Sequence, residues 1–352
     1  MTDKQPLIFD GHNDVLSKLL KAGGVAAAES FLTGNDNDID LPKARAGGFA
    51  GGFFAIWVAS PSEDHDYKEM MNSPPYDVPL PSEIPQSDAL AVVMQEAAIL
   101  LRLQALGALR ICTSVKDIRD CMETGTLAAI MHMEGAEAID PDFHVLDVLH
   151  QAGLRSIGPV WSRPTRFGEG VPFRFPSSPD IGGGLTEYGV QLIHRCNELG
   201  IMIDLSHLNE AGFNDVAQHS TKPLVATHSN SATLCEHARN LNDRQLRIIA
   251  ESDGVVGINF ATAFLSPDGT MRPDVSLDVM LQHLDHMLDI LGEDGVALGS
   301  DFDGAEIPAE IHDVQGLPNL RSAMEKHGYN AQLMNKICYG NWLRVLELTW
   351  EE

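Results

Sequence analysis

Short apolar segments alternate along this chain with longer stretches in which apolar residues recur at a helical period. The short segments are nearly continuous in apolar residues, a pattern typical of parallel strands that are covered on both faces. Eight strands are predicted on this basis: Leu7–Gly11, Gly52–Val58, Leu127–Met133, Arg155–Trp161, Ile201–Ser206, Leu224–Thr227, Val255–Phe260 and Val296–Ser300.

The clearest amphipathic helices between these strands are predicted over Ser87–Leu106, Thr186–Leu199 and Ser276–Leu291. This alternation predicts an α/β fold, a (β/α)8 TIM-like barrel of the metal-dependent hydrolase type, in which residues 1–352 form a single catalytic domain. A doubly wound open sheet would give a similar alternation. Two segments without a period, near residues 60–86 and 162–184, are predicted to be inserted loops at the carboxyl ends of their strands.

The composition restricts the partners and the cellular compartment. The formal net charge of -26 would repel nucleic-acid phosphates and anionic lipids, so neither is expected to bind. No secretion signal and no apolar segment of about 18 residues is found, so no membrane contact is expected. The five cysteines are scattered without paired spacing, which fits a reducing compartment, and the protein is therefore predicted to be cytoplasmic.

Residues of the types that commonly bind metals or transfer protons lie at the ends of five predicted strands. They are His12 with Asp14, Glu134, His207, His228 and Asp301. The carboxyl ends of barrel strands meet at one mouth, so these side chains are expected to converge. Imidazole and carboxylate are suitable zinc ligands, and Glu134 could bridge two ions that activate a shared water. Each residue alone is more often structural. Charges buried at five strand ends, however, are costly unless they are paired or bound to metal, and the set therefore predicts a metal site.

The motifs around these residues resemble those of the membrane (renal) dipeptidase family, a branch of the amidohydrolase-like barrels. The resemblance extends from the first strand almost to the C-terminus, and its most specific segments are Asp10–Asp14, Asp40–Gly48, Glu134-Gly135, Ile203–His207, Thr227–Ser229, Arg239-Asn240 and Gly299–Gly304. Many related amidohydrolases begin with His-x-His, whereas the His-x-Asp of this first strand is typical of the dipeptidases.

The resemblance implies a metal centre with two zinc ions per chain. His12 and Asp14 would bind one ion, His207 and His228 would bind the other, and Glu134 would bridge them. The implied enzyme hydrolyses the peptide bond of small dipeptides, L,D as well as L,L, with a water or hydroxide that bridges the two ions. The family also suggests a homodimer.

Two further roles follow from the resemblance. Arg239 would hold the C-terminal carboxylate of the substrate, which fits the bidentate pairing of guanidinium with carboxylate. Asp301 would take a proton from the bridging water and pass it to the leaving amine.

Two positions depart from the family pattern. Trp161 replaces a histidine expected to contact the substrate, and an indole cannot become cationic, so stabilisation of the oxyanion would rest on zinc, Arg163 or Arg166. Ala261 replaces an expected tyrosine. These changes keep two alternatives open, a binuclear metal amidohydrolase acting on a cyclic amide, lactone or N-acyl amino acid, and a non-catalytic metal-binding scaffold.

Three more polar residues near the strand ends have predicted structural roles. Asp204 is placed to orient a ligand imidazole, as carboxylates behind a metal site do. His132 is either a similar supporting residue or a packed core histidine, and Asp303 is predicted to cap a turn.

Overall fold

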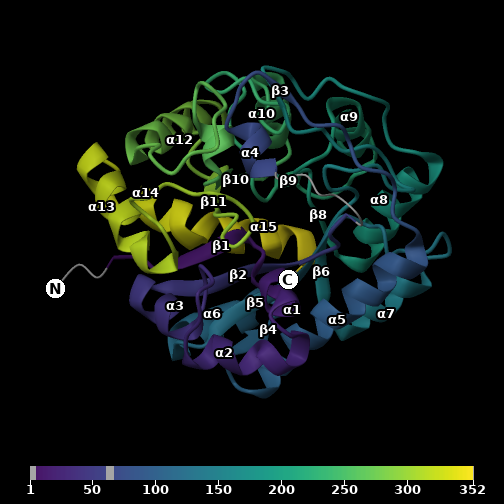
Figure 1. The fold of residues 1–352 in the computed structure, drawn as a ribbon, viewed down its shortest axis with the longest axis horizontal. Coiled ribbons are helices and arrows are strands. Elements are labelled where there is room, and N and C mark those ends of the chain that lie inside the picture. The colour runs from purple at the N-terminus through teal and green to yellow at the C-terminus, as the bar shows by residue number, and fades with distance from the viewer. Residues whose placement is uncertain (1–4, 61–66, 352) are drawn as a thin grey trace.

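The computed structural model describes residues 5–60 and 67–351, and its strands form the inner layer of a barrel surrounded by helices (Figure 1). Eight parallel strands coincide with the eight predicted ones: β1 (Ile8–Asn13), β2 (Phe49–Trp57), β5 (Leu127–Glu134), β6 (Leu154–Gly158), β8 (Met202–Ile203), β9 (Val225–Ala226), β10 (Val255–Asn259) and β11 (Val296–Gly299). The predicted strand positions are therefore confirmed.

The strands close into a ring. One sheet has the order β1-β2-β5-β6-β8 and a second has the order β9-β10-β11. Single parallel bridges, Asn13 to Phe302 and Asp204 to Val225, join the two sheets at both edges. At the first joint the carboxylate of Asp10 accepts hydrogen bonds from the amide and the hydroxyl of Ser300, each at 2.7 Å. This closure confirms the (β/α)8 barrel and excludes the open sheet.

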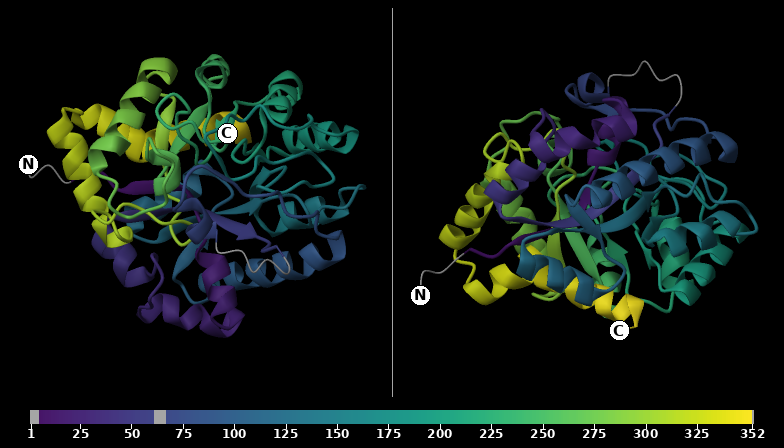
Figure 2. Two further views of the ribbon diagram at one scale, coloured as in Figure 1. Left: turned by 45° about the horizontal axis from the view of Figure 1, so that its top comes forward. Right: turned by 90° about the horizontal axis from the view of Figure 1, so that it is seen from below.

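Helices cover the outside of the ring in all three views (Figure 1, Figure 2). The longer ones are α5 (Gln86–Ala105), α6 (Val115–Thr124), α7 (His144–Ala152), α8 (Glu187–Leu199), α9 (Glu210–His219), α10 (Asp243–Glu251), α12 (Leu277–Leu291), α13 (Leu317–His327) and α15 (Asn341–Trp350). The shorter ones are α1 (Val15–Lys21), η1 (Gly24–Ala27), α2 (Ala28–Thr33), α3 (Leu41–Gly47), α4 (Tyr67–Met71), α11 (Thr262–Leu265), η2 (Val314–Gly316), α14 (Ala331–Asn335) and η3 (Lys336–Gly340).

Polar residues fix where several of these helices begin. The side chains of Thr186, Asn209 and Asn242 accept hydrogen bonds from the third residue of α8, α9 and α10, respectively. Such N-caps satisfy amides that have no partner inside the helix. The helices predicted over 87–106, 186–199 and 276–291 are α5, α8 and α12, so these predictions are confirmed within one residue at each end.

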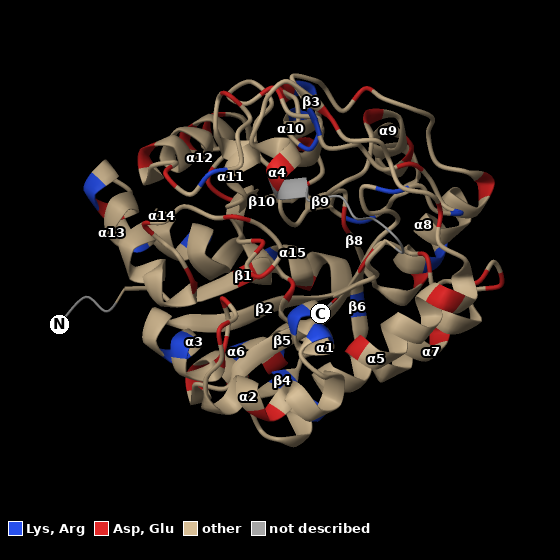
Figure 3. Ribbon diagram, viewed as in Figure 1, with Lys and Arg blue, Asp and Glu red and all other residues tan. Residues whose placement is uncertain are grey.

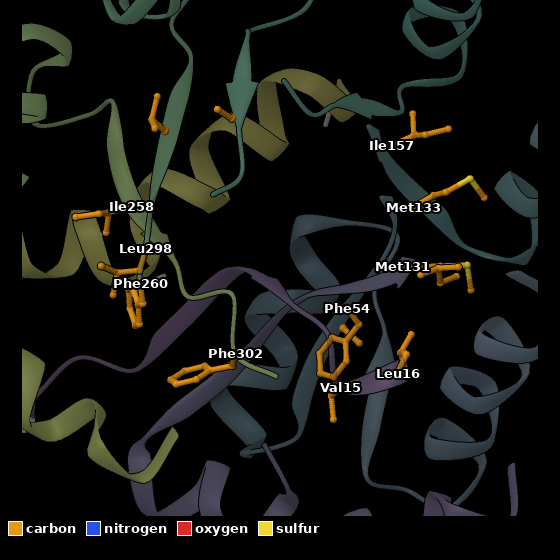
Figure 4. Packing of buried hydrophobic residues seen from close by; sticks show 14 of the residues in the cluster. Val15, Leu16, Phe54, Met131, Met133, Ile157, Ile258, Phe260, Leu298 and Phe302 are labelled. Atoms are coloured by element: carbon orange, nitrogen blue, oxygen red, sulfur yellow. The ribbon is translucent and has the colours of Figure 1, made fainter. Parts of the chain in front are cut away.

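The strand pleat divides the core into two layers. Ala128 and Ile130 of β5 point into the barrel, where they join the cluster around Trp342, whereas Met131 and Met133 point outward. Figure 4 shows the outer layer, in which Met131 and Met133 lie near Ile157, and Ile258 and Leu298 pack together. The same alternation directs the side chains of His132 and Glu134 of β5 inward, toward the barrel axis.

The two predicted loops contain short elements that the sequence pattern did not predict. β3 (Tyr76–Asp77) of the first pairs antiparallel with β7 (Arg174–Phe175) of the second, and α4 lies just before β3. A further strand, β4 (Leu109–Ile111), extends the sheet beside β5. Residues 61–66 of the first loop lie outside the described residues. Within the described part of the chain, no helix is both long and apolar enough to cross a membrane.

Candidate active site

The predicted metal-binding residues lie together at the carboxyl ends of the strands. Glu134 Oε1, at the end of β5, is 3.0 Å from His207 Nε2, 3.4 Å from His228 Nε2 and 3.7 Å from His12 Nε2. Asp14 Oδ2 is 3.4 Å from His12 Nε2. All five side chains are buried, although they come from four different strand ends.

The backbone is strained where it presents two of the site residues. His207 and Asp301 have φ angles of 67° and 60°, in the left-handed region that residues other than glycine rarely adopt. Such strain is concentrated at functional sites. Gly304 has a steric role nearby, because a Cβ at this position would collide with the carboxylates of Asp14 and Asp301.

Hydrogen bonds behind His228 determine which of its ring nitrogens faces the site. The Thr227 hydroxyl donates to Asp204 Oδ2 at 2.6 Å. It therefore accepts from His228 Nδ1, which lies 2.8 Å away. The proton is held on Nδ1 and the lone pair of Nε2 is directed toward Glu134, which is the tautomer that binds a metal ion. Asp204 thus orients this imidazole through Thr227, as predicted.

The other two histidines also offer nitrogen atoms to the centre. His207 Nδ1 lies 2.8 Å from the Ser162 hydroxyl, which leaves its Nε2 facing Glu134. Both ring nitrogens of the fully buried His12 lack a hydrogen-bond partner. An unpaired buried polar atom is costly, and coordination of a cation would satisfy His12 Nε2. The donor set therefore fits a divalent metal ion.

The electrostatics of the cluster lead to the same conclusion. Burial raises the pKa of Glu134 well above its usual range, and burial also raises the pKa of Asp301. Burial alone would lower the pKa of His12, but the carboxylates of Glu134 and Asp14 raise it to about 10. Burial lowers the pKa of His207 and His228, so both stay neutral. The acidic groups around His12 thus favour a positive charge among them, which a divalent cation could supply in place of the His12 proton.

A pocket of about 230 Å³ opens beside this cluster. Asp14, Glu134, His207 and Asp301 line its polar part, and Trp161 lines the pocket beside them. The remaining lining residues are Ser17, Lys18, Lys21, Trp57, Met71, Phe173, Phe264, Met271, Asp303, Gly304 and Ala305.

Arg239 lies behind the lining residue Phe264. Its Cζ is 5.3 Å from the centre of that ring, and its Nη2 donates to the carbonyl oxygen of His228 at 3.1 Å. The Nε atom is buried without a hydrogen-bond partner. Burial lowers the pKa of Arg239 to about 10, so the guanidinium is still a cation at neutral pH.

The two other arginines considered from the sequence do not reach the pocket. Arg163 is fully buried and donates to Glu137 Oε1 at 2.7 Å. Arg166 is exposed and lies over the Tyr188 ring. The expectation that either stabilises an oxyanion is wrong, because the first is consumed by a buried ion pair and the second faces solvent.

His132 and Asp303 are both held by hydrogen bonds near the site. His132 Nδ1 bonds the Ser156 hydroxyl at 2.8 Å inside the barrel, and its ring packs edge-on against His12. Asp303 accepts hydrogen bonds from the amides of Asp38 and Ile39, so it ties the segment after β11 to the segment before α3, and its predicted role as a turn cap stays a prediction.

Asn259 is a site residue that the sequence reasoning missed. Its Nδ2 donates to Asp301 Oδ2 at 2.9 Å and fixes that carboxylate. The sequence signal for Asn259 was a polar residue at the end of the seventh barrel strand, two residues before Ala261. Ala261 itself is buried and does not line the pocket.

Comparison with known proteins identifies the family of this chain. The model of the membrane dipeptidase family, peptidase family M19, matches residues 2–351. An uncharacterized protein in the pqqA 5′ region of Klebsiella pneumoniae is 48% identical over 267 residues, 75% of this chain and 98% of that protein. An uncharacterized protein in the PQQ-III 3′ region of Acinetobacter calcoaceticus is 42% identical over 287 residues, 80% of this chain and 89% of that protein.

Solved structures of similar proteins share the fold of this chain over nearly its whole length. A metallopeptidase from Rhodobacter sphaeroides, liganded with a phosphinate mimic of the dipeptide L-Ala-D-Ala, is 51% identical with a TM-score of 0.96, covering 99% of this chain and 100% of that one. A structure of dipeptidase AC, a metallopeptidase of family M19, gives the same values. An amidohydrolase from Pseudomonas aeruginosa, 21% identical with a TM-score of 0.74, covers 99% of this chain and 97% of its own and shares the fold.

The barrel with its buried histidine–carboxylate cluster, together with neighbours of the same fold over nearly the whole chain, thus defines a metallopeptidase. Within that class, the chain belongs to the membrane dipeptidase family, peptidase family M19. The metallodipeptidase function predicted from the motifs is confirmed at the level of the family.

Proposed function

We propose that this chain is a dinuclear zinc dipeptidase that cleaves L,D as well as L,L dipeptides. The observation that carries the proposal is the position of Glu134 Oε1, which lies within 3.7 Å of the Nε2 atoms of three histidines. A carboxylate so placed can bridge two ions. His12 and Asp14 would bind one of them, and His207 and His228 would bind the other.

When bound, two zinc ions would supply a water made nucleophilic near neutral pH and would polarise the scissile carbonyl. Asp301 would accept the proton of that water and deliver it to the leaving amine. The hydrogen bond from Asn259 occupies its Oδ2 and leaves Oδ1 for the proton. Burial, which raises the pKa of Asp301, favours this proton uptake.

Arg239 would bind the C-terminal carboxylate of the dipeptide. It is a buried cation beside the pocket, and its Nε has no other hydrogen-bond partner. An anchor one residue away from the cleaved bond favours dipeptides over longer chains. Trp161 would contact the substrate as an apolar wall, because its ring is 5.7 Å from the His207 ring. Because Arg163 and Arg166 are engaged elsewhere, stabilisation of the oxyanion would fall to the metal ions.

The ligand of the Rhodobacter sphaeroides neighbour supports a C-terminal D-residue. That protein was solved with a mimic of L-Ala-D-Ala and is 51% identical to this chain. The likeness favours a dipeptide over the cyclic amide, lactone or N-acyl amino acid considered from the sequence. A non-catalytic scaffold would not need the half-buried Asp301–Asn259 pair at the pocket.

The test is release of free amino acids from matched L,L and L,D dipeptides by zinc-loaded protein and by protein treated with a chelator. Zinc-dependent release is expected, with two zinc ions bound per chain. Arg239→Met should raise KM strongly for dipeptides and much less for dipeptide amides, which lack the carboxylate. Absence of release from every dipeptide, with two zinc ions still bound, would contradict the proposal.

We also propose a cytoplasmic location and a homodimer. All five cysteines are buried and unpaired, which supports a reducing compartment. The homodimer rests on the family resemblance alone, and sedimentation of the zinc-loaded protein would test it.

A further inference from the structure

A row of four aromatic rings runs along one side of the pocket. The ring centroids of Trp57 and Trp161 are 5.2 Å apart, those of Trp161 and Phe173 are 5.7 Å apart, and those of Phe173 and Phe264 are 6.1 Å apart. All four side chains line the pocket. The row therefore leads from the end of β2 across the barrel mouth to α11.

A cation lies at each end of this row. Arg239 Cζ is 5.3 Å from the Phe264 centroid, and Lys21 Nζ is 5.9 Å from the Trp57 centroid. The middle of the row lies beside His207, whose ring is 5.7 and 6.4 Å from the two central rings. Arg239 and Lys21 are thus at opposite ends of the row, and His207 lies beside its middle.

Lys18 and Lys21 lie one turn apart on α1 and both line the pocket. Figure 3 shows α1 as a basic segment in a chain whose acidic residues are twice as numerous as its basic ones. Among the residues that the structure describes, no carboxylate lies within 4.0 Å of either ammonium group. Both lysines are exposed, so their charges are available to a substrate.

The carboxyl groups that interact electrostatically with these lysines do not neutralise both ammonium charges. Burial raises the pKa of Glu96 to about 8 although the charge of Lys21 lowers it slightly, so this group is mostly protonated at neutral pH. Lys18 acts on Asp38 and Asp303, whose carboxyl groups hold each other's backbone amides. Among the residues that the structure describes, Lys21 is therefore the less compensated of the two cations.

We infer that Lys21, with Lys18 beside it, forms the subsite for the side chain of the N-terminal residue and selects dipeptides that begin with Asp or Glu. The inference rests on the proposed function, because Arg239 sets the direction of the substrate along the row. A substrate carboxylate would accept a hydrogen bond from the Lys21 ammonium, and the methylene groups before it would pack on Trp57.

The test compares kcat/KM for L-Glu-D-Ala and L-Gln-D-Ala, which have the same shape and differ in charge. Zinc-loaded wild-type protein should prefer the glutamate substrate about three- to tenfold, between the effects of an exposed ion pair and of a hydrogen bond to a charged group. The difference should lie mainly in KM and should shrink as the salt concentration rises.

Substitution of Lys21 assigns the preference to this residue. Lys21→Met should bring the ratio of the two kcat/KM values to about one, and Lys21→Glu should shift the preference toward L-Lys-D-Ala. The matched control is Lys116→Met on α6, which makes the same change of net charge at a side chain that is 79% exposed and bonded to Asp120. This control should keep the wild-type ratio.

Each other outcome overturns the inference at a different level. Equal hydrolysis of the two substrates by wild-type protein would overturn the acidic subsite and leave the dipeptidase intact. A preference that survives Lys21→Met would remove Lys21 from the subsite. Failure to hydrolyse any dipeptide would overturn the proposed function, and the inference would fail with it.

Discussion

At the scale of single residues, Thr227 connects the metal site to the charge behind it. Its hydroxyl is the link between the carboxylate of Asp204 and the Nδ1 atom of His228. Thr227→Val keeps the shape of the side chain but frees His228 to adopt the other tautomer. Zinc affinity should fall about 10- to 100-fold, the usual effect of removing a partner behind a ligand.

Competition with a chelator of known affinity measures this loss. Thr227→Ser retains the hydroxyl and is the matched control, so its zinc affinity should stay close to that of the wild type. Equal affinities in the valine and serine variants would contradict the role given to the hydroxyl.

Asp301 has the largest predicted effect on turnover. Asp301→Asn keeps the acceptor for Asn259 but removes the group that takes up the proton. The value of kcat should fall about 100- to 10,000-fold, the range of a general acid–base residue, with a smaller change in KM. Steady-state kinetics together with the zinc content of the same preparation measure this, because Asp301 also belongs with His12 and Asp14 to a group of side chains that could hold a metal ion.

Asp303→Asn, two residues further on, is the control for Asp301. Asp303 accepts hydrogen bonds from the amides of Asp38 and Ile39, so its substitution should lower the melting temperature. It should lower kcat much less than Asp301→Asn does. If both variants lost turnover equally with full zinc content, Asp301 would have no special part in proton transfer.

At the scale of elements, Arg163 joins three segments that follow different barrel strands. It donates to the carbonyl oxygen of Val58 after β2, to the Ser60 hydroxyl, and to Glu137 after β5, while it itself follows β6. Burial raises the pKa of Glu137, and Arg163 opposes that shift. Arg163→Met would leave this carboxyl buried without its partner and should lower the free energy of unfolding by about 3–5 kcal/mol.

Urea unfolding of the zinc-free protein measures this change, with Arg166→Met as the control. Arg166 is exposed, so its substitution should change the free energy of unfolding by less than about 0.5 kcal/mol. Replacing Glu137 by Gln in the Arg163→Met background should recover part of the loss, because the uncompensated acid is removed. No recovery would mean that lost packing, and not the charge, accounts for the destabilisation.

The barrel strands were predictable because strands buried on both faces appear as continuous apolar runs. Their lengths were not. The predicted strands over 201–206 and 224–227 shorten to two residues each, because Asp204 Oδ1 accepts hydrogen bonds from the amides of Ser206 and Thr227 in place of the sheet. A carboxylate that replaces part of a backbone ladder leaves no trace in the hydrophobic pattern.

The candidate site was predictable only where it is built from strand ends. His12, Glu134 and His228 converge because parallel strands bring their carboxyl ends to one mouth. The contact of Lys21 with Trp57 and the pairing of β3 with β7 join segments far apart in the sequence, so no local pattern reports them. Arg163 was misjudged for the same reason, since its partner Glu137 lies 26 residues before it.

At the scale of the whole molecule, Glu96 couples the active-site mouth to the stability of the fold. It belongs to α5, is fully buried, and accepts a hydrogen bond from the Trp57 amide at 2.7 Å through Oε2, while Oε1 has no partner. Burial raises the pKa of Glu96 to about 8 in the folded protein, whereas a glutamate in an unfolded chain titrates near ~4.3. The folded state therefore binds the extra proton between these two pH values.

The sign of the pH dependence follows from that difference. Because the folded protein binds more protons at Glu96 than the unfolded chain does, raising the pH from ~4.3 to about 8 lowers the free energy of unfolding. Glu96→Gln keeps an acceptor for the Trp57 amide and cannot ionise. Its stability relative to the wild type should thus be lowest at about pH 5 and should increase steadily toward pH 8.

Urea unfolding of the zinc-free wild type and of Glu96→Gln at constant ionic strength between about pH 5 and 8.5 measures this difference. Zinc must be absent, because metal binding has its own pH dependence and would mask the effect. Other buried acids, such as Asp10, whose pKa burial raises to about 7, titrate in both proteins and cancel in the comparison. A difference that does not change with pH would mean that Glu96 is ionised throughout, in which case Lys21 would have a charged partner and would be less available to an acidic substrate.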